Sequence, residues 1–131
     1  MLDALRSVLE SDARVAYALV FGSSARGTAH AESDVDVAVG LTPGDPLGAI
    51  AIGDLVSRLE AAVRRPVDVV LLDAAPPALA YRIFRDGIVV KERDHAALAA
   101  RKARAILEYL DFRPFEEQLT RGVLAVAARG R

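Results

Sequence analysis

A glycine–serine pair and two closely spaced aspartates are the residues of this chain best suited to phosphate chemistry. Gly22 and Ser23 end an apolar run, and Asp34 and Asp36 follow after ten intervening residues. In a strand, residues two apart share a face, so both carboxylates should project together while the intervening valines enter the core. Adjacent carboxylates repel each other and need a cation, and oxygen ligands favour Mg²⁺. The spacing therefore predicts a magnesium site at Asp34 and Asp36.

The Gly-Ser turn predicts a phosphate-binding site beside these carboxylates. Gly22 has no Cβ, so a phosphate can approach the backbone closely there. Ser23 offers a hydroxyl and a backbone N–H, Ser24 belongs to the same turn, and the short helix expected next would direct its N-terminal dipole at the anion. Arg26 is either a charged donor to phosphate or a charge on the helix surface. A phosphate cradle beside a metal-binding carboxylate pair is the combination that nucleotidyl transfer requires.

A third carboxylate is offered by Asp68, which lies inside an apolar segment at residues 66–72. Its valine neighbours should pack on the opposite face, and a lone aspartate in such a strand is costly unless it is paired or coordinating. Three carboxylates can hold two metal ions about 3.5–4 Å apart, and Asp68 would then be a ligand beside the metal ion that activates the attacking hydroxyl. Asp73 is the competitor for this role, but it follows the strand and is expected to cap the next helix.

The elements that must position these residues alternate between strands and helices. Short apolar runs predict strands at residues 15–21, 33–39, 66–72 and 87–92, the last at a sheet edge. Helical spacing, with Pro46 and Asp94 as start signals, predicts helices at 2–13, 46–65, 77–84 and from 94 onward. Pro114 should break or kink the last of these near residues 111–113, leaving a final helix at 115–128. The pattern predicts an α/β fold, a small mixed sheet flanked by helices, in one domain of residues 1–131 with a helical tail from about residue 94.

Composition and charge exclude several other classes of protein. Hydrophobic residues make up 53% of the chain and charged residues 27%, and there is no cysteine, which excludes a disulfide scaffold and a thiol nucleophile. Residues 1–90 hold 8 Lys/Arg and 12 Asp/Glu, a net charge of −4, and residues 91–131 hold 9 Lys/Arg and 6 Asp/Glu, a net charge of +3. A duplex nucleic-acid binder would usually have a stronger basic excess. The charged N-terminus predicts no signal peptide, and no apolar run reaches the roughly 18 residues of a membrane span. We expect a cytoplasmic protein with no direct contact to membranes or duplex DNA.

The chain resembles the polymerase-β-like nucleotidyltransferase superfamily in its active-site signature. The shared elements are Gly22-Ser23, a gap of ten residues, Asp34-x-Asp36 and the later Asp68. In its small size the chain resembles the minimal nucleotidyltransferase (MNT) branch of this superfamily. The tail from Arg93 to Pro114 is similar to the C-terminal segment of MNT antitoxins encoded beside HEPN-domain toxins. The resemblance implies that the protein transfers AMP from ATP, with Mg²⁺, onto a tyrosine of a HEPN ribonuclease and so silences it.

Two other functions are compatible with the same residues. A nucleotidyltransferase of this type could instead modify a small molecule such as an aminoglycoside, or the chain could neutralise a partner by contact alone. An adjacent reading frame encoding a small helical protein with an Arg-x4–6-His motif would favour the HEPN partner.

The aromatic and basic residues of the later helices have structural interpretations first. Tyr81 and Phe84, at helical spacing, are expected in the core, and His95 is expected to be an ordinary first-turn residue. The aromatic residues Tyr109, Phe112 and Phe115 could belong to the core or to a partner surface. The basic residues Arg101, Lys102 and Arg104 are expected on a solvated helix face.

Overall fold

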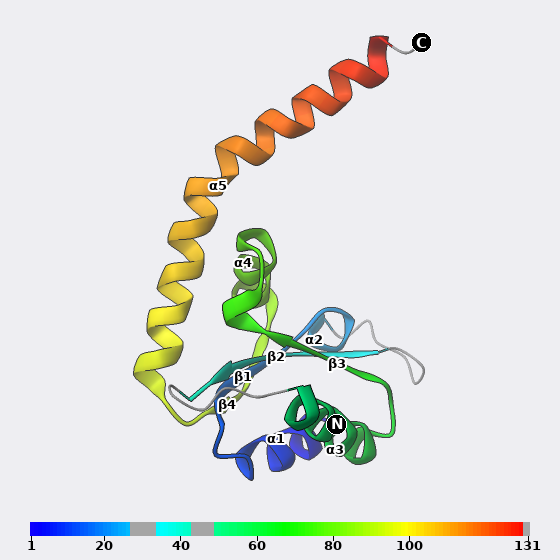
Figure 1. The fold of residues 1–131 in the computed structure, drawn as a ribbon, viewed down its shortest axis with the longest axis vertical. Coiled ribbons are helices and arrows are strands. Elements are labelled where there is room, and N and C mark those ends of the chain that lie inside the picture. The colour runs from blue at the N-terminus through cyan, green and yellow to red at the C-terminus, as the bar shows by residue number, and fades with distance from the viewer. Residues whose placement is uncertain (27–33, 43–48, 130–131) are drawn as a thin grey trace.

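The protein is built on a four-stranded mixed sheet, as seen in a computed structural model that describes residues 1–26, 34–42 and 49–129. The strand order is β3-β2-β1-β4, with β1 antiparallel to both neighbours and β2 parallel to β3. The strands are β1 (Val15–Phe21), β2 (Val35–Leu41), β3 (Val67–Leu71) and β4 (Ile88–Glu92). The predicted α/β fold class and the position of the last strand at an edge are confirmed (Figure 1).

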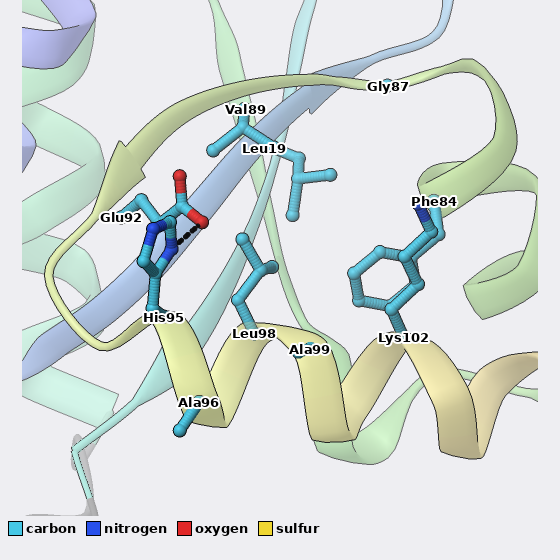
Figure 2. Close-up of a pocket in the computed structure, with 10 residues that line it drawn as sticks. All are labelled: Leu19, Phe84, Gly87, Val89, Glu92, His95, Ala96, Leu98, Ala99 and Lys102. Carbon is cyan, nitrogen blue, oxygen red and sulfur yellow. Dashed lines mark hydrogen bonds and ion pairs between the residues drawn. The ribbon is translucent and has the colours of Figure 1, made fainter.

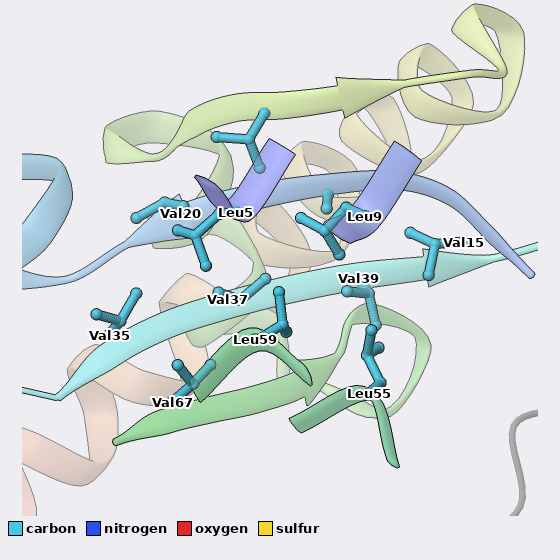
Figure 3. Packing of buried hydrophobic residues seen from close by; sticks show 12 residues of the cluster. Leu5, Leu9, Val15, Val20, Val35, Val37, Val39, Leu55, Leu59 and Val67 are labelled. Atoms are coloured by element: carbon cyan, nitrogen blue, oxygen red, sulfur yellow. The ribbon is translucent and has the colours of Figure 1, made fainter. Parts of the chain in front are cut away.

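Helices cover both faces of this sheet. On one face lie α1 (Leu2–Glu10) and α3 (Ala49–Val63), and on the other lie α4 (Pro77–Asp86) and the first half of α5 (His95–Arg129). Leu5, Leu9 and Leu59 pack on the valines of β2, as Figure 3 shows. The opposite core contains Leu19 and Ile83 among other residues. Because both faces are covered, β1 is an almost continuous apolar run rather than an alternating one.

The C-terminal helix α5 is a single helix of 35 residues. The prediction that Pro114 separates two helices is therefore wrong, although Figure 1 shows the helix axis changing direction in its orange part. A proline removes one backbone hydrogen bond, and a long helix can bend there without ending. The predicted cap is confirmed, because the backbone N–H of Ala97 donates to the Asp94 carboxylate at 3.0 Å.

Several element boundaries differ from those predicted. Helix α1 ends at Glu10 rather than near residue 13, and α4 continues to Asp86. Strand β2 begins at Val35, so Asp34 lies just before the strand and not within it. A short 3₁₀ helix at Leu72–Ala74 takes the end of the third predicted strand. The predicted start of the second helix at Pro46 lies outside the described residues.

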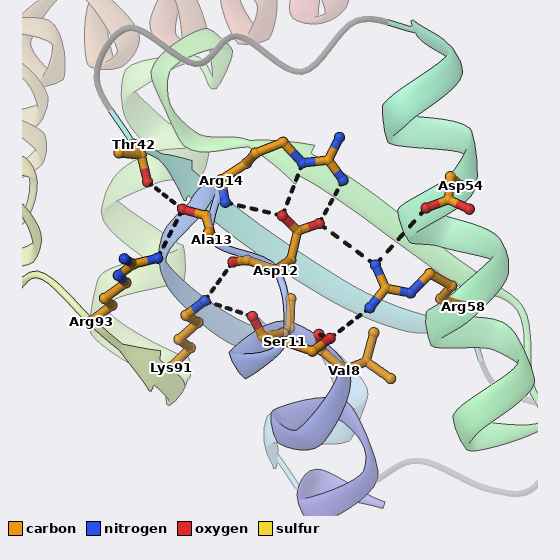
Figure 4. Close-up of polar contacts among 11 residues, drawn as sticks. Val8, Ser11, Asp12, Ala13, Arg14, Thr42, Asp54, Arg58, Lys91 and Arg93 are labelled. Atoms are coloured by element: carbon orange, nitrogen blue, oxygen red, sulfur yellow. Dashed lines mark hydrogen bonds and ion pairs between the residues drawn. The ribbon is translucent and has the colours of Figure 1, made fainter.

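A buried polar cluster joins α1 to the sheet at the end away from the predicted site (Figure 4). Asp12 accepts hydrogen bonds from the Arg14 side chain at 2.9 and 2.8 Å, and these bonds lower the pKa of its carboxyl. The Lys91 ammonium donates to the carbonyls of Leu9 and Asp12 at 2.6 and 2.7 Å. Burial lowers the pKa of Lys91. Lys91 therefore anchors the end of α1. Because its ammonium group is buried, it is not part of the exposed basic surface of residues 91–131.

None of the helices in the described part combines the length and the apolar character needed to cross a bilayer.

Candidate active site

The register between β2 and β3 brings two of the predicted carboxylates level with each other. Asp36 pairs directly with Asp68 across these parallel strands, so their side chains project from the same face of the sheet. The valines on either side, including Val35 and Val67, are buried against α1 and α3. The predicted division of this segment into a carboxylate face and a core face is thus seen in the structure.

The three predicted carboxylates differ in exposure. Asp36 is half-buried, whereas Asp34 and Asp68 are exposed. The premise that Asp68 is buried in an apolar strand, and so needs a partner, is wrong because β3 is an edge strand. Its place in the candidate site depends instead on its register with Asp36.

The surroundings of Asp36 disfavour its ionised form, and a nearby cation would offset this effect. Burial raises the pKa of Asp36, and the negative charges of Asp68 and Asp34 raise it further. Among the side chains that the structure describes, no three acidic, histidine or cysteine residues form a ready metal cage. Mg²⁺ is commonly held by one or two carboxylates together with water and substrate phosphates, and the Asp36–Asp68 pair fits that donor set.

Two physical reasons favour glycine at position 22. Gly22 has φ +70°, a conformation that side-chain-bearing residues rarely adopt. A Cβ there would also lie 2.5 Å from Asp36 Oδ2. The turn therefore places the backbone directly against this carboxylate, and the expected short helix follows as α2 (Ser23–Arg26). The side chains of Ser24 and Arg26 lie outside the described part, so their nucleotide-binding roles remain predictions.

A cavity of about 390 Å³ opens beside this turn. Phe21 and Gly22 form one wall, and α4 forms the other through Leu79, Arg82, Arg85 and Asp86. The two arginines are candidate functional residues that sequence reasoning missed. Only their i, i+3 spacing on the polar side of α4 could have drawn attention to them, and that spacing is common on helix surfaces.

A larger cavity of about 790 Å³ lies between the sheet and the first turns of α5 (Figure 2). Its lining is largely apolar and includes Leu19, Phe84 and Leu98, with a hydrogen-bonded Glu92–His95 pair at one end. Phe84 packs against the core, as predicted. None of the predicted site residues lines this cavity, so its size alone does not make it the active site.

Two other predictions about charged residues are wrong. The α4 helix begins after Pro76 without a side-chain cap, so Asp73 does not cap it. Asp73 instead lies 3.6 Å from the Arg101 guanidinium and 3.9 Å from that of Arg104. Arg101 was expected on a solvated face but is buried, and it donates to the Leu72 carbonyl at 2.8 Å. These contacts tie α5 to the far end of β3, away from Asp68.

Comparison with known proteins identifies the family. Residues 3–96 match the family described as polymerase beta nucleotidyltransferase, and this chain belongs to that family. A comparison with curated proteins gave no match.

Solved structures extend the likeness along nearly the whole chain. A chain of a toxin–antitoxin complex with AMP-PNP aligns with a TM-score of 0.80 at 23% identity, covering 94% of this chain and 98% of that chain. A chain of the complex between a tri-AMPylated Shewanella oneidensis HEPN toxin and its MNT antitoxin gives a TM-score of 0.73 at 20% identity, with 95% and 99% covered. A minimal nucleotidyltransferase is 33% identical, with a TM-score of 0.55 over 66% of this chain and 93% of that one. The resemblance to the minimal branch is confirmed.

Proposed function

We propose that this chain is a Mg²⁺-dependent adenylyltransferase that moves AMP from ATP onto a hydroxyl of a HEPN-domain partner, with tyrosine as the expected acceptor, and so acts as an antitoxin. The observation that carries the proposal is the level pairing of Asp36 and Asp68 against the Gly22 turn. Family membership supports nucleotidyl transfer. The similar complexes, one with AMP-PNP and one with a tri-AMPylated HEPN toxin, support the nucleotide and the partner.

In the proposed reaction the acceptor oxygen forms a bond to the α-phosphorus of ATP. The bond from that phosphorus to the oxygen bridging the α- and β-phosphates breaks, and pyrophosphate leaves with the electron pair. The hydroxyl proton passes to Asp68 or to water, because Asp68 is the exposed carboxylate of the pair. Bound Mg²⁺ would neutralise phosphate charge and make the hydroxyl more acidic.

The other predicted residues bind and orient the substrate. Asp36, with Asp34 before the strand, would hold Mg²⁺, which would help to neutralise the charge of the phosphates. The backbone at Gly22 leaves room for a phosphate, and the Ser23 hydroxyl would donate to it. We assign Ser24 and Arg26 to phosphate binding as well, because they follow Ser23 closely in the sequence.

A protein acceptor fits the surface better than a small molecule does. The larger cavity has the size of a small-molecule site, but none of the three carboxylates lines it. On α5, Leu107 and Leu110 are 63% and 53% exposed and lie about one helical turn apart, so they form an apolar surface that a protein partner can cover. We infer that residues 1–131 act as one domain, that the partner docks along α5, and that the reaction takes place in the cytoplasm, where ATP is available.

Two experiments test this proposal. In the first, the protein is incubated with labelled ATP, Mg²⁺ and the protein encoded in the adjacent reading frame; we expect the neighbour to gain mass in units of AMP, on tyrosine. Asp68→Asn should stop labelling and leave the complex intact, since it replaces one carboxylate oxygen by an amide group of the same size and the proposed docking surface lies on α5. A neighbour that binds but is never modified would favour inhibition by contact, and efficient labelling of an aminoglycoside without any partner would favour the small-molecule function.

The second experiment measures nucleotide binding directly. Mg²⁺-ATP should raise the unfolding midpoint by mass action, because a ligand at 100 times its Kd stabilises by about 2.7 kcal/mol. ATP with EDTA should do so much less. The double variant Asp34→Asn/Asp36→Asn should lose the metal-dependent part, and equal shifts in wild type and double variant would contradict the ligand assignment.

A further inference from the structure

The wall of the Gly22 cavity that α4 forms carries two positive charges. Arg82 and Arg85 are spaced i, i+3 on that helix, so they lie on the same side of it. Both line the cavity opposite Phe21 and Gly22. The two guanidinium groups, however, have different partners.

Arg85 is held by its neighbours within the protein. Its guanidinium donates to both carboxylate oxygens of Asp86, at 3.0 and 2.9 Å. It also lies 5.7 Å from the centroid of the Tyr81 ring, and Tyr81 stacks on Tyr109 of α5 with centroids 4.1 Å apart. Its charge is therefore already compensated, and its place is fixed by the α4–α5 contact.

Arg82 is not compensated in this way. Its hydrogen bond is a long one, from Nε to the Ala78 carbonyl at 3.3 Å, one turn earlier on the same helix. Within residues 1–26, 34–42 and 49–129, no described carboxylate lies within 4.0 Å of its guanidinium. A guanidinium carries five N–H donors, so most of the donors of Arg82 remain available to a ligand in the cavity.

The position of this cavity indicates which part of the substrate it takes. Its Gly22 wall adjoins Asp36, yet none of the three predicted carboxylates lines it. A group bound in the cavity therefore lies next to Gly22 but apart from the carboxylates. A triphosphate whose α-phosphate is held at the carboxylates can extend its β- and γ-phosphates into this space. An anion approaching Gly22 is repelled by the nearby carboxylates, and an uncompensated arginine on the facing wall offsets that repulsion.

We propose that Arg82 binds the β- and γ-phosphates of the nucleoside triphosphate and positions pyrophosphate as the leaving group. This inference rests on the proposed nucleotidyltransferase function. The planar guanidinium can form two parallel hydrogen bonds to phosphate oxygens, which an ammonium group cannot do. Arg82 would thus select triphosphates over monophosphates, whereas the carboxylates and their metal would act on the α-phosphate.

The test compares binding of Mg²⁺-AMP-PNP with binding of AMP to the full chain. Titration calorimetry measures AMP-PNP directly, and competition against AMP-PNP measures AMP. Arg82→Ala should weaken AMP-PNP about 10- to 100-fold, the range for lost hydrogen bonds to a charged group, and should leave AMP within about twofold. The affinity of Arg82→Lys for AMP-PNP should lie between those of the wild type and Arg82→Ala. Lys102→Ala, which removes an exposed cation from the other cavity, is the matched control and should not change either affinity.

Each result supports or overturns a specific claim. Wild-type affinity for AMP-PNP in Arg82→Ala would overturn the inference and leave the proposed function standing. Equal weakening of AMP-PNP and AMP would also overturn it, since Arg82 would then contact a part that both ligands share. If wild type binds neither nucleotide, the proposed function itself fails. Unchanged unfolding midpoints without ligand would show that the variants remain folded.

Discussion

Replacing Asp36 by asparagine should make the metal-free protein more stable, although it should abolish nucleotide transfer. The pKa of Asp36 is raised in the folded protein by burial and by the charges of Asp68 and Asp34. The folded state therefore binds more protons than the unfolded state. The resulting stabilisation is full below the unfolded-state pKa and is lost as pH rises through the folded-state pKa. At neutral pH the ionised carboxylate destabilises the fold, and Asp36→Asn removes that charge.

The register gives the size of the effect. Paired residues on neighbouring strands lie about 4.8 Å apart, and two unit charges at that distance repel by about 1 kcal/mol in water and about 3.5 kcal/mol at an effective dielectric constant of about 20. Asp68 is exposed, so solvent screening favours the lower figure. About 1 kcal/mol in a domain of this size corresponds to a midpoint increase of about 3–5 °C.

The assay is thermal unfolding in EDTA across a pH series. Asp36→Asn should raise the midpoint at pH 7, and the gain should shrink as pH falls through the folded-state pKa of Asp36. Asp68→Asn should raise it as well, and the double variant should gain less than the sum, because both single changes remove the same repulsion. Asp54→Asn is the control: this exposed residue lies 3.9 Å from Arg58, so its loss should not stabilise. Fully additive gains, or a lower midpoint in Asp36→Asn, would refute the reasoning.

Three further outcomes are expected from the structure. Gly40→Ala should lower the free energy of unfolding by about 1–3 kcal/mol in urea titrations, because a Cβ there would lie 2.0 Å from the buried Tyr17 ring. Gly53→Ala is the control, because a Cβ there would meet nothing within 4 Å. It should instead raise the free energy of unfolding by up to about 1 kcal/mol. Lys91→Met should cost about 2–4 kcal/mol of unfolding free energy, since two carbonyls of the α1 end lose a charged donor; an unchanged urea midpoint would contradict this. Ser23→Ala should reduce kcat/KM for ATP by a factor equivalent to about 1–3 kcal/mol at an unchanged melting temperature. An unaltered kcat/KM would count against the phosphate cradle.

Much of the fold could be predicted from local sequence signals. The strand at residues 15–21 was predicted with the boundaries seen in the structure, because an unbroken apolar run ends at a glycine. The continuity of α5 could not be predicted in this way. Proline affects one hydrogen bond and its immediate neighbours, while helix formation is cooperative over many residues, so Pro114 gives a weaker stop signal than its local chemistry indicates.

The candidate site was predictable where its residues are close in sequence or in strand register. The Gly-Ser and Asp-x-Asp spacing led to Gly22 and Asp36, whose contact the structure shows. Arg82 was missed because the sequence does not say which side of α4 faces the turn. The burial of Arg101 had a signal, since it lies on one helical stripe with Leu98 and Ala105, both buried.

The core on the other face of the sheet also determines the geometry of the candidate site. Successive residues of β2 point to opposite faces, so a one-residue slip against β3 would exchange Asp36 with its valine neighbours. Val35, Val37 and Val39 are fully buried under α1 and α3, and such a slip would expose them and bury the carboxylates. The cost of that exchange makes the register effectively all-or-none. The level position of Asp36 and Asp68 therefore follows from hydrophobic packing on the far side of the sheet, and it needs no metal or nucleotide to form. The carboxylates repel each other in that position because the core does not allow them to separate.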